Sequence, residues 1–184
     1  MKKEYVYNGL LVNVLATVIA VPVIFVMIYG YELMNSIDSF FPTFLESLEG
    51  KLVSIKVFYV VSIFLGILIH EFLHGVIFAF YAENGLKDVK FGFNVKACAP
   101  YAHCKSAICK NQYIFALVMP GLVLGIIPAI WSLFYSNILI YSWSILFVIS
   151  ALGDFLILIR MIGLDQETLI LDHPKKVGFI IASN

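Results

Sequence analysis

The chain consists of long apolar stretches separated by short polar ones. Charged residues are sparse in four stretches, which cover about residues 9–30, 53–82, 112–135 and 138–162. A helix needs about 20 residues to cross the hydrocarbon core of a bilayer, where its backbone amides must be satisfied within the helix. The pattern therefore predicts an all-α membrane protein with four transmembrane helices. Because internal repeats and low-complexity linkers are absent, we expect a single domain over residues 1–184.

Prolines interrupt two of these predicted helices. Pro22 lies in the first, and Pro120 and Pro128 lie in the third. A proline inside a helix removes an amide donor, so kinks or breaks are expected there. Gly121 and Gly125 form a G-x-x-x-G pair beside Pro120, which predicts the close approach of another backbone.

The segment between the second and third stretches has a different pattern. Over residues 89–101, apolar residues alternate with mostly polar ones, starting with Val89 and Phe91. This period of two predicts an amphipathic strand, with Pro100 at an edge or a turn. A weaker return strand near 103–108 would complete a small β-hairpin that lies at the membrane interface or serves a function. Near the end of the chain, residues 177–181 predict another strand or a segment docked on the helices.

Composition supports a membrane location. The chain is 61% hydrophobic and has a mean hydropathy of +0.96, whereas a soluble domain is roughly 45–50% apolar. A formal net charge of +0 gives no reason to expect a nucleic-acid partner. The partner that composition predicts is therefore the lipid bilayer.

The charges between the predicted helices favour one orientation. Residues 83–111 carry five lysines against two acidic residues, whereas residues 31–52 carry four acidic residues and one lysine. Because cytoplasmic loops are rich in lysine and arginine, both termini and residues 83–111 are predicted to be cytoplasmic. Lys2 and Lys3 precede an apolar run that is long enough to span and has no evident cleavage site, so we expect a retained first helix.

The three cysteines lie close together in the same polar segment. Cys98, Cys104 and Cys109 are odd in number and fall on the predicted cytoplasmic side, which favours reduced thiols. A second metal site built from Cys98, Cys104 and His103 is an alternative, but its spacing matches no standard zinc pattern.

The second apolar stretch contains His70-Glu71-Phe72-Leu73-His74, an H-E-x-x-H sequence. Histidines four residues apart share one helix face, with Cβ atoms about 6 Å apart, so both imidazoles can bind one Zn²⁺ ion. Glu71 is rotated by about 100° from His70 and can instead reach a water held by the metal as a general base. Ionisable groups inside a membrane span suggest a functional site.

A catalytic zinc site usually has a third protein ligand. Of the acidic residues, only Glu71 and Asp154 lie well inside a predicted span. His74 and Asp154 each lie roughly 12 Å from the same end of two helices that run in the same direction, so their side chains can meet. Gly153 would allow these helices to approach closely.

Other interpretations of the third ligand stay open from the residues alone. Asp154 would instead be a buried hydrogen-bonding group between helices, paired with Arg160. Asp165 and His173 are further candidate ligands, although both follow the last predicted span.

These residues resemble known proteins. The H-E-x-x-H sequence in a membrane helix, followed by an intramembrane aspartate, is similar to the site-2 protease class of intramembrane metalloproteases. Over about 70–180, the chain more closely resembles a bacterial "putative zincin peptidase" family, described as a domain of unknown function. The similar features are His70–Gly75, Lys90-Phe91-Gly92-Phe93, Pro120, Gly153-Asp154, Leu171-Asp172-His173-Pro174 and Gly178-Phe179.

The resemblance implies one Zn²⁺ ion held by His70, His74 and Asp154, with Glu71 catalytic and the 89–101 strand beside the site. It also implies a multi-pass protein of the bacterial plasma membrane. One difference is that site-2 proteases place the aspartate before a glycine, whereas here Gly153 precedes Asp154.

The predicted function is zinc-dependent hydrolysis of peptide bonds within or near the membrane, with a membrane protein or peptide as the substrate partner and Glu71 activating a zinc-bound water. The alternative is a catalytically inactive metal-binding membrane protein that acts as a partner-binding or structural module. Structural zinc sites usually have four protein ligands, so three visible ligands and a free Glu71 favour catalysis. A transporter is a weaker alternative, because the helices contain no other charged pathway.

Overall fold

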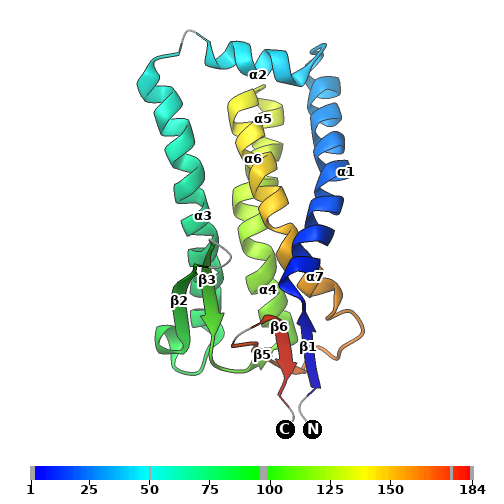
Figure 1. The fold of residues 1–184 in the computed structure, drawn as a ribbon, viewed down its shortest axis with the longest axis vertical. Helices are drawn as coiled ribbons and strands as arrows, with labels where there is room; N and C mark the ends of the chain where they lie inside the picture. Colours follow the sequence, from blue (N-terminus) through cyan, green and yellow to red (C-terminus); the bar gives the residue numbers. More distant parts are fainter. Residues whose placement is uncertain (1–2, 50, 96–98, 175, 183–184) are drawn as a thin grey trace.

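The computed structural model describes residues 3–49, 51–95, 99–174 and 176–182. Four helical segments run along its length, and each is long and apolar enough to cross a membrane, as predicted (Figure 1). They are α1 (Gly9–Asn35), α3 (Val53–Tyr81), α4 to α5 (Lys110–Phe134) and α6 to α7 (Ile138–Ile159). A short helix, α2 (Phe40–Leu48), lies across one end of the bundle, where only a loop was expected.

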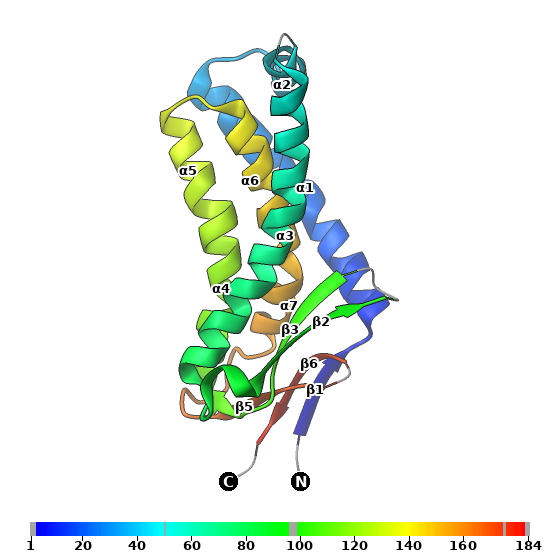
Figure 2. The ribbon, with the colours of Figure 1, turned by 90° about the vertical axis from the view of Figure 1, so that its left-hand side faces the viewer.

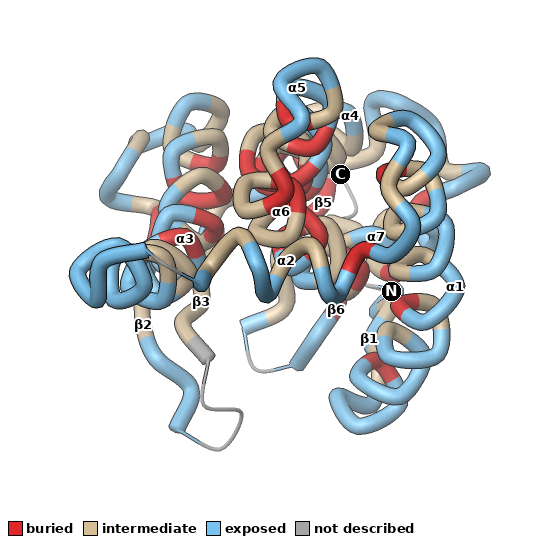
Figure 3. The backbone as a smooth tube through the Cα atoms, turned by 90° about the horizontal axis from the view of Figure 1, so that it is seen from above, coloured by how far each residue is buried: buried red, intermediate tan, exposed pale blue. Residues whose placement is uncertain are grey.

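The β-structure and both chain ends lie at the opposite end of the bundle (Figures 1 and 2). Buried residues gather between the helices, while the outer helix faces are largely exposed (Figure 3). Many exposed residues are large and apolar, for example Phe25, Phe58, Phe64 and Phe134. Such a surface is far more apolar than that of a soluble monomer, and it suits contact with lipid.

The third helical segment is irregular where its first proline predicts it. α4 (Lys110–Pro120) ends at Pro120 and continues as a π-helical segment, η2 (Gly121–Ile126), before α5 (Ile127–Phe134). Because Pro120 has no N–H, the regular ladder of α-helical hydrogen bonds cannot pass through it. Pro22, in contrast, lies inside an uninterrupted α1.

The predicted close approach at the G-x-x-x-G pair is confirmed. A Cβ atom on Gly121 would lie 2.8 Å from the Ala151 side chain, and one on Gly125 would lie 2.8 Å from Val148. The predicted close approach at Gly153 is wrong, because nothing lies within 4 Å of a Cβ atom placed there. The fourth segment instead bends at Ala151, between α6 (Ile138–Ser150) and α7 (Leu152–Ile159).

The alternating segment forms a hairpin, and its predicted boundaries are wrong. β2 (Val89–Asn94) pairs antiparallel with β3 (Ala99–Cys104), so the return strand starts well before residue 103. Phe91 pairs with Ala102 and Gly92 with Tyr101, so Phe91 and Tyr101 lie on opposite faces of the hairpin. A single strand over 89–101 would have put both on one face. The hairpin packs on α3, where a Cβ atom on Gly75 would lie 2.1 Å from the Phe91 ring.

A second sheet corrects the all-α prediction. Its strand order is β1-β6-β5-β4, and all neighbouring strands pair antiparallel. The strands are β1 (Lys3–Tyr7), β4 (Ile108–Cys109), β5 (Leu169–Asp172) and β6 (Val177–Ile181). The predicted strand at 177–181 is therefore confirmed, whereas β1 was not foreseen. We call this four-stranded sheet the terminal sheet.

A buried apolar cluster joins the terminal sheet to the helices. Four side chains lie at its centre, and each is no more than 3% exposed. They are Phe78 from α3, Tyr113 from α4, Met161 just after α7, and Phe179 from β6. The ring of Phe78 stacks on that of His74, with centroids 6.4 Å apart. The core that supports the sheet thus extends directly to the H-E-x-x-H sequence.

Candidate metal centre

The lower half of α3 places two histidines next to each other inside the protein. His70 and His74 are 7% and 5% exposed, and their ring centroids are 4.9 Å apart. One helical turn separates them, so both rings project from the same side of α3. Burial of two imidazoles among apolar helices requires polar partners.

Asp154, in the first turn of α7, provides a shared partner. Its Oδ2 atom lies 3.2 Å from Nε2 of His70 and 3.4 Å from Nε2 of His74. The structure thus brings together the three side chains that were predicted to meet. A hydrogen bond between helices is present at Asp154, as that alternative expects, but its predicted pairing with Arg160 is wrong. The Nε–H of Arg160 donates to the hydroxyl of Tyr7 at 3.0 Å, and its guanidinium lies over the Tyr7 ring.

The spacing of these donor atoms fits a zinc ion. Zinc bonds to imidazole nitrogen and carboxylate oxygen are about 2.0–2.2 Å long, so ligand atoms of a tetrahedral site lie about 3.3–3.6 Å apart. The two distances from Asp154 Oδ2, 3.2 and 3.4 Å, are close to such edges. Two imidazoles and one carboxylate are also a common donor set for catalytic zinc.

The orientation of His74 depends on a free backbone carbonyl in α4. Nδ1 of His74 lies 2.8 Å from the carbonyl oxygen of Ala116 and donates its hydrogen to it. In a regular helix this carbonyl would accept from residue 120, but Pro120 has no N–H. The hydrogen on Nδ1 leaves the lone pair of Nε2 directed toward Asp154, as a metal ligand requires.

Glu71 lies beside the two histidines. Ligand atoms of His70, Glu71 and His74 all lie within 4.8 Å of one another, so the Glu71 carboxylate is close to any ion that the two histidines hold. Oε2 of Glu71 accepts a hydrogen bond from the backbone N–H of Ala102 in β3, at 2.9 Å. The hairpin therefore contacts the candidate centre directly.

The other predicted metal ligands lie elsewhere. His173 accepts a hydrogen bond from the Lys176 amide, and Asp165 accepts one from Thr168 through its backbone carbonyl. The second metal site is also not formed by its described members. Cys104 donates to the Ser106 carbonyl, and burial raises the pKa of its thiol, which keeps it protonated. Cys98 lies outside the described residues.

One hydrogen-bonded cluster was missed by the sequence reasoning. The carboxylate of Asp172, at the end of β5, accepts from His103 Nδ1 at 2.7 Å and from the hydroxyl of Tyr113 at 2.8 Å. It also accepts from the Cys104 amide at 3.4 Å. These bonds join β3, α4 and β5 beside the candidate centre. The signal in the sequence is Leu171-Asp172-His173-Pro174, which resembles the family but does not reveal the partners of Asp172.

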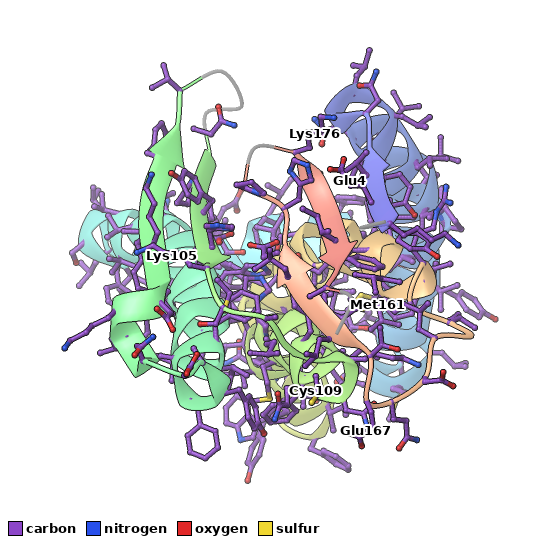
Figure 4. The ribbon with its side chains drawn as sticks, turned by 90° about the horizontal axis from the view of Figure 1, so that it is seen from below. Glu4, Lys105, Cys109, Met161, Glu167 and Lys176 are labelled. Carbon is purple, nitrogen blue, oxygen red and sulfur yellow. The ribbon has the colours of Figure 1, made fainter. Side chains whose placement is uncertain are left out.

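Two cavities flank the hairpin. One, of about 430 Å³, lies between α3 and the hairpin and is lined by Glu71, Phe72 and Tyr101 among others. The other, of about 660 Å³, lies between β3 and the turn that follows β5, and we call it the hairpin groove. Ala102, His103, Ile157, Asp172 and Lys176 are among its lining residues. Figure 4 shows the two sides of the hairpin groove, with the hairpin and Lys105 on one side and Lys176 on the other.

Comparison with known proteins gives one match. A family model described as "Putative zincin peptidase" matches residues 63–168, which include the H-E-x-x-H sequence, the hairpin and Asp154. No match was found among curated proteins or among solved structures.

Proposed function

This chain belongs to the putative zincin peptidase family, and we propose that it is a zinc metallopeptidase that hydrolyses peptide bonds within a membrane or at its surface. The observation that supports this most strongly is the convergence of both histidine Nε2 atoms on one oxygen of Asp154, with Glu71 alongside. A hydrogen bond between two helices would need only one histidine and Asp154, so the second histidine and Glu71 are not explained by helix packing.

In this proposal, His70, His74 and Asp154 hold the zinc ion. When bound, zinc polarises the carbonyl of the peptide bond and lowers the pKa of water toward about 7. The Glu71 carboxylate accepts a proton from the attacking water and delivers it to the nitrogen of the leaving amine. A hydrogen bond to the Ala116 carbonyl holds His74 in place during these transfers, and in the absence of substrate the Ala102 N–H positions Glu71.

The proposed location is the inner half of a membrane. His74 lies seven residues before the end of α3, and Asp154 lies five residues before the end of α7. At about 1.5 Å per residue, His74 is about 10 Å and Asp154 about 8 Å from the end of the bundle that carries the two sheets. Because lysines concentrate at this end and acidic residues around α2, we assign the sheet end to the cytoplasm.

The proposed substrate is a peptide segment in an extended conformation. A helical substrate has its amides hydrogen-bonded internally, so it must unwind before water can attack a peptide bond. The hairpin groove lies beside both Ala102, which contacts Glu71, and Ile157, one turn after Asp154. A peptide bound there would reach the candidate centre from the cytoplasmic side.

The decisive experiment combines metal analysis with peptide cleavage. The full chain is purified in detergent, and bound zinc is measured for the wild type, Glu71→Gln, His70→Ala and Asp154→Ala. We expect one zinc ion per chain in the wild type and Glu71→Gln, and a large loss in the other two variants. Cleavage of a proteome-derived peptide library should occur with the wild type and disappear with Glu71→Gln.

The outcomes separate the alternatives. Zinc binding without cleavage that depends on Glu71 would support the inactive metal-binding module instead. Full zinc retention in Asp154→Ala would remove Asp154 from the ligand set.

A further inference from the structure

The outer edge of β3 faces the hairpin groove and has almost no free hydrogen-bond donor. Ala102 pairs opposite Phe91, and its N–H points away from β2 to reach Glu71. Residues two apart on a strand point the same way, so Pro100 and Cys104 share this outer edge. Pro100 has no N–H, and the N–H of Cys104 donates to Asp172.

The same geometry leaves acceptors available on this edge. In an antiparallel ladder, the N–H and the C=O of one residue point to the same side. The carbonyls of Pro100 and Ala102 therefore also point away from β2, and none of the described hydrogen bonds beyond the strand ladders ends on either. At Cys104 the edge is covered by Asp172, whereas Pro100 and Ala102 line the groove.

A peptide strand added to this edge would have one point of full pairing. Opposite Ala102, a substrate residue can donate its N–H to the Ala102 carbonyl and accept from the Ala102 N–H. The second of these bonds needs a donor that Glu71 occupies at 2.9 Å. Peptide binding and the contact between Glu71 and the hairpin are therefore mutually exclusive at this atom.

We propose that the Ala102 N–H is exchanged between Glu71 and a carbonyl oxygen of an extended peptide substrate, so that substrate pairing itself releases the general base. This inference rests on the proposed function. Without peptide, the Glu71 carboxylate accepts the Ala102 N–H and is held against the hairpin. With peptide, the N–H turns to the substrate, and Glu71 becomes free to accept the proton of the attacking water.

The exchange has a consequence for specificity. The substrate residue opposite Ala102 must have an N–H, so proline is excluded there, and the next residue that needs an N–H lies two positions away, opposite Pro100. Side chains of the peptide are not constrained by these bonds. Ala102 therefore recognises the extended backbone of the peptide and not its side chains.

The first test uses substrates only. The library peptide that the zinc-loaded wild type cleaves fastest is resynthesised with a single N-methyl group at each position in turn. We expect cleavage to fall about tenfold or more when the methyl group is at either of two positions, the residue opposite Ala102 and the residue opposite Pro100. At each of them the methyl group removes one backbone hydrogen bond. Uniform tolerance along the peptide, or proline accepted at every position of cleaved library peptides, would overturn the exchange.

The second test measures peptide affinity without cleavage. A fluorescein-labelled copy of the same peptide is titrated into Glu71→Gln, which keeps an acceptor for the Ala102 N–H, and into Glu71→Ala, which does not. We expect Glu71→Ala to bind about fivefold more tightly, since no internal bond has to be broken. In the background of Ala102→Pro, which removes the N–H from an edge that already tolerates Pro100, the two affinities should be equal.

The matched variant Ala102→Gly keeps the N–H and isolates its effect from that of the side chain. We expect kcat/KM of Ala102→Pro to be about tenfold below that of Ala102→Gly, with equal zinc content. If wild-type cleavage depends on Glu71 but these two variants are equal, the exchange is wrong and the proposed function stands. If the wild type shows no cleavage that depends on Glu71, both are wrong.

Discussion

Replacing Pro120 by alanine should weaken zinc binding although residue 120 is not itself a ligand. The new N–H would donate along the helix to the Ala116 carbonyl, which now accepts from His74 Nδ1 at 2.8 Å. Since His74 is only 5% exposed, water cannot easily replace a lost acceptor. A buried donor left unpaired costs about 1–3 kcal/mol, which corresponds to about 5–150-fold in affinity. Loss of the partner that orients a metal-bound histidine typically costs about 10–100-fold.

The measurement is a competition titration of zinc against a chromophoric chelator with the full chain in detergent. Pro22→Ala is the control, because it makes the same chemical change inside α1, which contributes no side chain to the centre. We expect Pro22→Ala to bind zinc like the wild type. Pro120→Ala should keep its helical circular dichroism, because alanine favours a helix by about 3 kcal/mol over proline. Equal zinc affinity of Pro120→Ala and the wild type would refute the argument that this proline frees the Ala116 carbonyl.

Three further predictions address the surroundings of the centre. Gly75→Ala should loosen the hairpin, because its Cβ would lie 2.1 Å from the Phe91 ring; faster limited proteolysis within the hairpin is expected, and unchanged proteolysis would contradict this packing. Asp172→Ala should lower the free energy of unfolding by about 1–3 kcal/mol by leaving the buried Tyr113 hydroxyl without its acceptor, and adding Tyr113→Phe should restore part of the loss in thermal unfolding. Zinc at 100 times its Kd should stabilise the wild type by about 2.7 kcal/mol, and a similar gain for His70→Ala would argue against His70 as a ligand.

The helices and the candidate centre could be predicted because both depend on strong local signals. Length and hydropathy alone define a spanning helix, and the spacing of His70 and His74 is a property of one helix. The meeting with Asp154 followed from helix direction and depth, which topology determines. The same reasoning failed at Gly153, where a close approach of helices was predicted but nothing lies within 4 Å of a Cβ atom. The helix bends nearby, at Ala151.

Pairings between distant segments could not be predicted in the same way. The alternation over 89–101 indicates strand character, but the register between β2 and β3 decides which residues share a face. The sequence around Asp172 also does not reveal its partners, since they come from β3 and α4. The role of Pro120 was visible as an irregularity, but not as the reason that His74 finds an acceptor.

The pairing of β1 with β6 affects when a newly synthesised chain can complete the fold around Asp154. Lys3–Tyr7 is synthesised long before its partner strand, Val177–Ile181. The hydroxyl of Tyr7 donates to the Leu156 carbonyl in α7 at 2.9 Å, so the helix that carries Asp154 is also secured late. Contacts between segments this distant in sequence form slowly. Chains halted before Val177 would therefore lack the β1–β6 pairing that supports this end of α7, and any peptidase activity would wait for that pairing to form.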